Sequence, residues 1–260
     1  MPQKVTSLLA IDIGNTNTVV GLLKSGKLVQ SWRLTTVRER TSDEHGILIK
    51  SLLRLGGFEQ AEFEGIAISC VVPPLLPGIK EMAVKYFGHE PFVVQPGIKT
   101  GMPILYEHPQ EVGADRIVNA VAAFHKYGGP CVVIDLGTAT TFDAISARGE
   151  YLGGIIAPGI LVSAEALFER AAKLPRVEIK EPDEVIGRNT VSAMQSGIFY
   201  GYLGLIEKIV SLAEAQLGNH TVTIATGGLA SLIAKGTSKI HHIEPDLTLD
   251  GLQILFDMNQ

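Results

Sequence analysis

The sequence predicts an α/β protein whose two halves repeat one pattern of strands. Apolar runs rich in β-branched residues, and bounded by Gly or Pro, alternate with segments that carry apolar residues at helical spacing. Shifting the chain by 123 positions aligns five identical pairs: Ile11 with Ile134, Asp12 with Asp135, Gly14 with Gly137, Thr18 with Thr141, and Gly26 with Gly149. We therefore expect two similar domains, at residues 1–112 and 113–260.

The strands and helices follow one another along both halves. Strands are predicted over residues 7–14, 18–34 (a hairpin), 65–72, 91–95, 130–137, 140–146, 151–156 and 221–226. The first helix is expected to begin near residues 41–43 and to stop at Gly56, because cap residues precede it and glycines follow it. Further helices are expected over 75–87, 114–127, 160–173, 190–217, 229–234 and 248–257.

Composition excludes several classes of protein. Of the 260 residues, 46% are hydrophobic and 19% are charged, which is typical of a folded globular chain rather than a disordered one. The longest apolar runs fall short of the roughly 18 residues that a membrane span needs. A net charge of −5 without a Lys/Arg cluster argues against binding to nucleic acid. The first residues lack the features of a signal peptide, so we expect a cytoplasmic protein.

Each half contains a hairpin with an aspartate at its mouth. In both halves an apolar strand ends in Asp-x-Gly, a polar turn follows, and a Gly-containing turn ("KSGK", "ARGE") reverses the next strand. Such a turn lets backbone N–H groups approach a phosphate chain, and Asn and Thr side chains add neutral donors. A carboxylate repels phosphate, so Asp12 is interpreted as a ligand of Mg²⁺ or of its water shell. A single copy would be better explained as an ordinary turn after a strand, and the second copy with its Thr-rich continuation favours phosphate binding instead.

A third motif, "TIATGGLAS", places Thr226, Gly227 and Gly228 between a strand and a helix. After two Asp-x-Gly hairpins, it resembles the adenosine motif of the superfamily of acetate kinase, sugar kinases, Hsp70 and actin. The ordered set "DIGNTNT", "GADR", "DLGTATTFD", "GGIIAPGI" and "TGGLA" resembles type III pantothenate kinase over almost the whole chain. The resemblance implies duplicated actin-like ATPase (ribonuclease H-like) domains with a nucleotide cleft between them.

The same resemblance implies an activity and a set of site residues. The activity is transfer of the ATP γ-phosphate to the primary hydroxyl of pantothenate, which gives 4′-phosphopantothenate for coenzyme A biosynthesis. Asp115 matches the proton acceptor. Asp135 matches a ligand of K⁺ or NH₄⁺, and it is equally the position where the wider superfamily holds water around Mg²⁺. Positions that match ATP contacts are Asp12, Ile13, Gly14, Asn15, Thr16, Asn17, Thr18, Val19 and Thr138. Positions that match pantothenate contacts are Tyr106, Gly113, Ala114, Asp115, Arg116 and Thr190. The implied partners are ATP, pantothenate and a second copy of the chain.

The residue types in "GADR" suit these roles chemically. Phosphoryl transfer has a loose transition state, so an ordinary carboxylate at Asp115 can accept the hydroxyl proton late in the reaction. Arg116 can bind the pantothenate carboxylate through two parallel hydrogen bonds. Both residues begin a predicted helix, whose free N–H groups also favour anions. The alternative is that Asp115 only caps the helix and that Arg116 is a solvated surface charge.

Several other residues fit ordinary structural roles, and two other functions fit part of the sequence. Cys70 and Cys131 lie in apolar runs and are expected to be reduced core residues, while Lys99 lies in a long loop and is expected to be solvated. The helix over 190–217 carries an apolar stripe that indicates core or a dimer contact, made of Met194, Ile198, Tyr202, Leu205, Ile209 and Leu212. Two alternative functions remain: an ATP-binding regulatory protein without kinase activity, and a polyphosphate-type hydrolase. Neither needs both the base and the arginine of "GADR".

Overall fold

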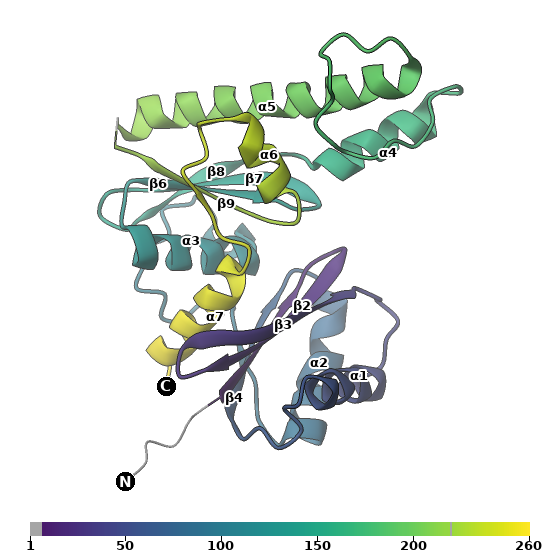
Figure 1. Ribbon diagram of the computed structural model, residues 1–260. Coiled ribbons are helices and arrows are strands. Elements are labelled where there is room, and N and C mark those ends of the chain that lie inside the picture. The colour runs from purple at the N-terminus through teal and green to yellow at the C-terminus, as the bar shows by residue number, and fades with distance from the viewer. Residues whose placement is uncertain (1–6, 219) are drawn as a thin grey trace. The chain divides into compact units, whose positions relative to one another are not determined.

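The computed structural model describes residues 7–218 and 220–260, which form two compact units (Figure 1). The first unit contains the residues up to 101, together with 107–122 and 247–260, and the second contains 102–106 and 123–246. This division differs from the expected boundary between residues 112 and 113. Residues 247–260 fall in the first unit because the C-terminal helix packs on the first sheet, and the sequence repeat carries no sign of that return.

The first unit is built on a five-stranded mixed sheet in the order β3-β2-β1-β4-β5. Its strands are β1 (Ser7–Ile13), β2 (Asn17–Lys24), β3 (Lys27–Thr35), β4 (Phe63–Cys70) and β5 (Phe92–Val93). Strand β1 pairs antiparallel with β2 and parallel with β4, and it is almost wholly buried, as a central strand covered on both faces must be.

Two helices cover one face of this sheet. Helix α1 (Ser42–Leu55) starts at a capping box in which the Thr41 side chain accepts a hydrogen bond from the Glu44 N–H, and the Glu44 carboxylate accepts one from the Thr41 N–H. The helix expected over 75–87 consists of η1 (Pro73–Leu75), α2 (Leu76–Met82) and the π-helical turn η2 (Ala83–Phe87). These elements bury a core against the sheet that includes Ile11, Val20, Ile49, Leu53 and Ile79.

Helix α7 (Leu247–Met258) packs on β1 and β4 of the same unit. Gly65 on β4 makes this approach possible, because a Cβ atom there would lie 2.4 Å from the Phe256 ring. The Thr248 hydroxyl donates a hydrogen bond of 2.7 Å to the Asn119 side chain on α3 (Ala114–Tyr127). The last helix of the sequence is therefore part of the first unit.

The second unit repeats the first sheet, in the order β10-β9-β6-β7-β8. Its strands are β6 (Cys131–Leu136), β7 (Ala139–Ile145), β8 (Tyr151–Pro158), β9 (Val222–Thr226) and β10 (His242–Ile243). Strand β6 pairs antiparallel with β7 and parallel with β9, as β1 does with β2 and β4. The predicted duplication is confirmed at the level of strand order and direction.

The helices of the second unit include the long α5 (Thr190–Leu217), with α4 (Ile160–Arg170), α6 (Ala230–Ile233) and the short η4 (Ala234–Gly236) (Figure 1). In the apolar stripe predicted for α5, Met194, Ile198 and Tyr202 are buried, and Leu205 and Ile209 pack against the same core. Leu212 is exposed, so the stripe is core only over its N-terminal part. Cys131 is buried and Cys70 is half-buried, and both are free thiols, as expected.

The two hairpin turns differ by one residue. Ile13 pairs with Thr18 across the first turn, whereas Leu136 pairs with Thr140 across the second. The structural counterpart of Thr18 is therefore Thr140 rather than Thr141. The constant shift of 123 positions missed this because the second turn is one residue shorter.

Candidate active site

The polar turn of the first hairpin is fixed by a hydrogen bond within the turn and by hydrogen bonds from Thr36, which follows β3. The Gly14 N–H donates to the Asn17 carbonyl at 3.0 Å, and the Thr36 N–H donates to the Thr16 carbonyl at 2.9 Å. The Thr36 hydroxyl donates to the Gly14 carbonyl at 2.8 Å and lies 2.9 Å from the hydroxyl of Thr18. The turn is thus fixed by a residue that follows β3, while Asn15 and Thr16 at its tip are exposed.

Asp12 lies near the end of β1, paired with Val19 on β2 and Ser69 on β4. Its Oδ1 atom is buried and accepts no hydrogen bond from the part of the chain that the structure describes. Burial, followed by the charge of Asp115, raises the pKa of Asp12 to about 7, while the Ser69 hydroxyl and the Arg33 charge act in the opposite direction. A carboxylate in this setting is stabilised in its charged form by a cation.

The "GADR" residues lie at the start of α3. Gly113 precedes the helix, and a Cβ atom there would lie 2.6 Å from Asp115 Oδ1, so the absence of a side chain leaves room for the carboxylate. The Arg116 N–H donates to Asp115 Oδ1 at 2.8 Å. Burial raises the pKa of Asp115 above its ordinary value, although the Arg116 N–H and guanidinium partly offset this effect.

These contacts correct two sequence-based interpretations. Arg116 is only 9% exposed, so it is not the solvated surface charge that the alternative interpretation required. Asp115 has a raised pKa rather than that of an ordinary carboxylate, because its position at the start of α3 is buried. Asp12 and Asp115 are close enough to raise the pKa of Asp12, so the first unit brings together two acids that are 103 positions apart in the sequence.

In the second unit, Asp135 lies near the end of β6 and Thr138 lies in the turn that follows. The "TGG" motif reaches this point, because a Cβ atom on Gly227 would lie 2.7 Å from Asp135 Oδ1. Gly227 also has a φ of +92°, a left-handed conformation that favours glycine. The Gly159 N–H donates to the Thr138 carbonyl at 3.1 Å and so fixes the turn from the start of α4. The second Asp-x-Gly hairpin and the "TGG" motif therefore meet at Asp135.

Tyr106 and Thr190 lie in other parts of the second unit. The Tyr106 ring is tilted against Tyr151, with ring centroids 6.4 Å apart, and lies 3.6 Å from the position that a Cβ atom on Gly153 would take. Thr190 is exposed at the first turn of α5.

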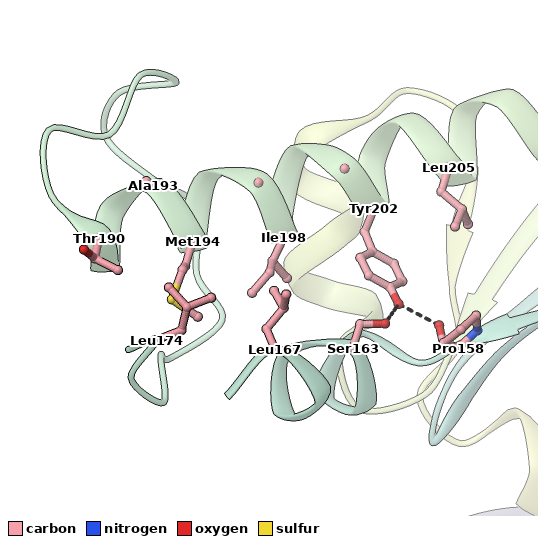
Figure 2. Close-up of a pocket in the computed structure, with 12 residues that line it drawn as sticks. Pro158, Ser163, Leu167, Leu174, Thr190, Ala193, Met194, Ile198, Tyr202 and Leu205 are labelled. Carbon is pink, nitrogen blue, oxygen red and sulfur yellow. Dashed lines mark hydrogen bonds between the residues drawn. The ribbon is translucent and has the colours of Figure 1, made fainter. Parts of the chain in front are cut away.

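Thr190 lines one end of an apolar cavity of about 760 Å³ between α4 and α5 (Figure 2). At the other end, the Tyr202 hydroxyl donates to the Pro158 carbonyl and lies 2.6 Å from the Ser163 hydroxyl. Because an α-helix rises about 1.5 Å per residue, the Thr190 and Tyr202 backbones are roughly 18 Å apart. Thr190 is thus separated from the β8–α4 junction at Pro158.

Sequence patterns did not identify Arg33, Thr36 or Ser69 as neighbours of the first hairpin. Each lies on or just after a strand next to the hairpin, and each reaches it only through strand pairing. The alternation of Trp32, Arg33 and Leu34 in a predicted strand was the available signal for Arg33, because it places the arginine on the face opposite the two apolar residues.

The duplicated sheet, with an aspartate near the end of each first strand, places the chain in the class of actin-like ATPase and sugar-kinase folds. Solved structures support this class: a ROK hexokinase from Thermus thermophilus has a TM-score of 0.51 at 15% identity, covering 96% of this chain and 98% of that one. A structure described as a "Baf family transcriptional activator" from Campylobacter jejuni has a TM-score of 0.61 at 20% identity, covering 96% and 98%. At these identities the likeness shows the fold alone.

The sequence comparisons are more specific. Residues 8–212 match the family model described as type III pantothenate kinase. A type III pantothenate kinase from Syntrophotalea carbinolica is 54% identical over 253 residues, covering 97% of this chain and 99% of the relative. One from Geobacter sulfurreducens is 53% identical over 253 residues, with the same coverage. The chain belongs to the type III pantothenate kinase family.

Among residues 7–218 and 220–260, no helix is both long enough and apolar enough to cross a membrane. Within the same ranges, no group of three or more His, Cys, Asp or Glu side chains is arranged to hold a metal ion.

Proposed function

We propose that Asp115 accepts the proton of the primary hydroxyl of pantothenate while the γ-phosphate of ATP is transferred to its oxygen. The products are 4′-phosphopantothenate and ADP. The family match supports a kinase of coenzyme A biosynthesis rather than a non-catalytic regulator or a polyphosphate hydrolase. The observation that carries the assignment of the base is the buried Asp115 carboxylate, which lies at the start of α3 near Asp12 and has a raised pKa.

The environment of Asp115 suits a base in phosphoryl transfer. In a loose transition state the attacking oxygen retains its proton until late, so the base has to orient the hydroxyl and then accept the proton. Burial makes the Asp115 carboxylate more basic, and the Arg116 N–H fixes one of its oxygens. The carboxylate is thus held in one orientation, in which it can position the substrate hydroxyl.

Arg116 is proposed to bind the carboxylate of pantothenate. Its guanidinium is buried near the start of α3, where its own charge and the positive end of the helix dipole both favour an anion. Gly113 and Ala114 offer backbone to the substrate without large side chains. Tyr106 and Thr190 are proposed as further pantothenate contacts on the family resemblance.

The two polar turns are proposed to bind the nucleotide. Residues 12–19 offer N–H groups and the side chains of two asparagines and two threonines, and the bonds from Thr36 keep their backbone in one conformation. Thr138 offers a hydroxyl in the corresponding turn of the second unit. The expectation of a nucleotide cleft between the two halves stays a prediction.

The residues present fit the cations that the family implies. Asp12 has a buried carboxylate oxygen without a hydrogen bond among the described residues, which suits one contact to Mg²⁺, an ion that commonly takes one or two carboxylates and completes its shell with substrate phosphates and water. When bound, Mg²⁺ neutralises charge on the phosphate oxygens. Asp135 is proposed to hold K⁺ or NH₄⁺, because its carboxylate lies beside a turn rich in carbonyl and hydroxyl oxygens.

The enzyme is further proposed to act as a homodimer in the cytoplasm, where ATP is available. Support for the dimer comes from large exposed apolar side chains on adjoining elements, β8 and α4, since exposed apolar patches mark interaction sites. These side chains are Ile155, Ile156, Leu161, Val162, Leu167 and Phe168. Light scattering of the purified chain tests this, with the mass of a monomer as the contradictory result.

The activity is tested by incubating the purified chain with pantothenate, ATP and Mg²⁺ in potassium buffer. Mass spectrometry should find 4′-phosphopantothenate and ADP in equal amounts. ADP without phosphopantothenate would instead support the hydrolase, and ATP binding without turnover would support the regulator.

A further inference from the structure

Arg33 lies in the same cross-strand row as Asp12. Asp12 of β1 pairs with Val19 of β2, and Val19 pairs with Arg33 of β3. Residues paired directly across neighbouring strands project to the same face of a sheet. With strands about 4.8 Å apart, the Asp12 and Arg33 backbones are roughly 10 Å apart, a gap that the long arginine side chain can partly span.

The neighbours of Arg33 confirm which face it occupies. Trp32 and Leu34 pack against the core between the sheet and helices α1 and α2. Side chains alternate along a strand, so Arg33 projects to the opposite face, which is the face of Asp12. The electrostatic effect of Arg33 on Asp12 agrees with this placement, because the guanidinium charge lowers the pKa of that carboxyl.

The Arg33 side chain is exposed and makes no hydrogen bond or ion pair with the side chains of residues 7–218 and 220–260. It is therefore not committed to a structural ion pair. The lysines on the same two strands, Lys24 and Lys27, lie at the far turn of the hairpin, away from Asp12. Arg33 is thus the cation that the β2–β3 pair places in the row of Asp12.

We propose that Arg33 is a phosphate-binding residue that contacts the polyphosphate chain of ATP at the first hairpin. The inference rests on the proposed function, in which the turn at residues 14–17 holds the phosphates. Asp12 and Asp115 contribute negative charge at this end of the sheet, and both would repel a phosphate chain. A guanidinium offsets that repulsion and can donate two parallel hydrogen bonds to phosphate oxygens.

The test compares Arg33→Gln and Arg33→Lys with a matched control, Arg38→Gln, which removes an exposed arginine from the loop after β3. Calorimetry measures the affinities for Mg-ATP and for adenosine, and steady-state kinetics measures the KM for pantothenate. Arg33→Gln should weaken Mg-ATP binding by roughly tenfold or more, because hydrogen bonds to charged groups are lost. Adenosine affinity and the pantothenate KM should stay within about twofold, and Arg33→Lys should retain part of the ATP affinity by its charge.

Two outcomes would overturn the inference. One is a Mg-ATP affinity within about twofold of wild type in both Arg33 variants, because losing a hydrogen bond to a charged group would reduce the affinity by more than that. The other is an equal loss of adenosine and ATP affinity, which would show that Arg33 supports the fold rather than the phosphates. If the wild type binds ATP through Arg33 but makes no phosphopantothenate, the proposed function fails while the inference stands.

Discussion

Thr36→Val tests how the turn of the first hairpin, which is proposed to bind phosphate, is held in one conformation. Valine has nearly the shape of threonine but lacks the hydroxyl, so the variant loses the 2.8 Å bond to the Gly14 carbonyl and the 2.9 Å contact with the Thr18 hydroxyl. Thr18 is only 3% exposed, so its hydroxyl would be left buried without this partner. A lost hydrogen bond and an unsatisfied buried group together cost about 2 kcal/mol, which corresponds to a fall in Tm of roughly 4–8 °C for a chain of this size.

The same change should act on ATP more than on pantothenate. A turn that has lost two of its restraints presents its N–H groups less precisely, so the KM for ATP should rise severalfold while the KM for pantothenate stays near its wild-type value. Thermal unfolding and steady-state kinetics provide the two readouts. Thr36→Ser keeps the hydroxyl, so its Tm and its KM for ATP should be close to the wild-type values. Thr35→Val changes the exposed neighbouring threonine and serves as the control. If Thr36→Val matched wild type in Tm and in KM for ATP, the bonds would not hold the turn.

Three further predictions concern other parts of the chain. Gly227→Ala should lower Tm and raise the K⁺ concentration needed for half-maximal activity, because the new Cβ would lie 2.7 Å from Asp135 Oδ1 and the residue has a φ of +92°. Gly228→Ala is the control: its Cβ would enter open space, so neither Tm nor the K⁺ requirement should change. Activity at saturating Mg²⁺ should rise with K⁺ or NH₄⁺ but not with Na⁺ or choline at equal ionic strength, and Asp135→Asn should blunt that response; full activity in choline alone would refute the potassium role. Burial lowers the pKa of His45 to about 4, so the folded state takes up a proton less readily than the unfolded state, and the free energy of unfolding should fall as pH drops from about 6.5 towards 4. Denaturant titrations should show that the free energy of unfolding depends less on pH in His45→Gln than in wild type. An equally weak pH dependence in the exposed control His125→Gln would contradict the assignment of this effect to His45.

The repeated strand pattern could be predicted because both hairpins carry local signals. An apolar strand, a Gly-bearing turn and a second strand are visible in the sequence around Asp12 and Asp135, and the sheets that contain them share one order. The position of α7 could not be predicted in the same way. Its apolar residues indicate a helix, but the sheet that receives it is set by contacts such as Phe256 on Gly65, which only the folded chain shows.

In the candidate site, too, the features marked by a local motif could be predicted, and those that depend on packing could not. The "GADR" motif pointed to Asp115 and Arg116, but their burial, which sets the basicity of Asp115, depends on the packing around the start of α3. Arg33 and Thr36 act near Asp12 through strand pairing over some twenty positions, and no local motif marks them. Aligning the two halves at a constant shift of 123 positions also missed that the second turn is one residue shorter than the first.

The Asp115→Asn variant tests the central claim most directly. Asparagine keeps the size of the side chain but cannot accept the hydroxyl proton, and removing a general base typically costs a factor of about 10²–10⁴ in rate. The measurement is kcat for 4′-phosphopantothenate formation at saturating ATP, pantothenate, Mg²⁺ and K⁺, alongside calorimetric affinity for Mg-ATP. The account predicts a fall in kcat of roughly 100-fold or more, with ATP affinity within about twofold of wild type. A variant that keeps a near wild-type kcat would contradict the assignment of Asp115 as the base.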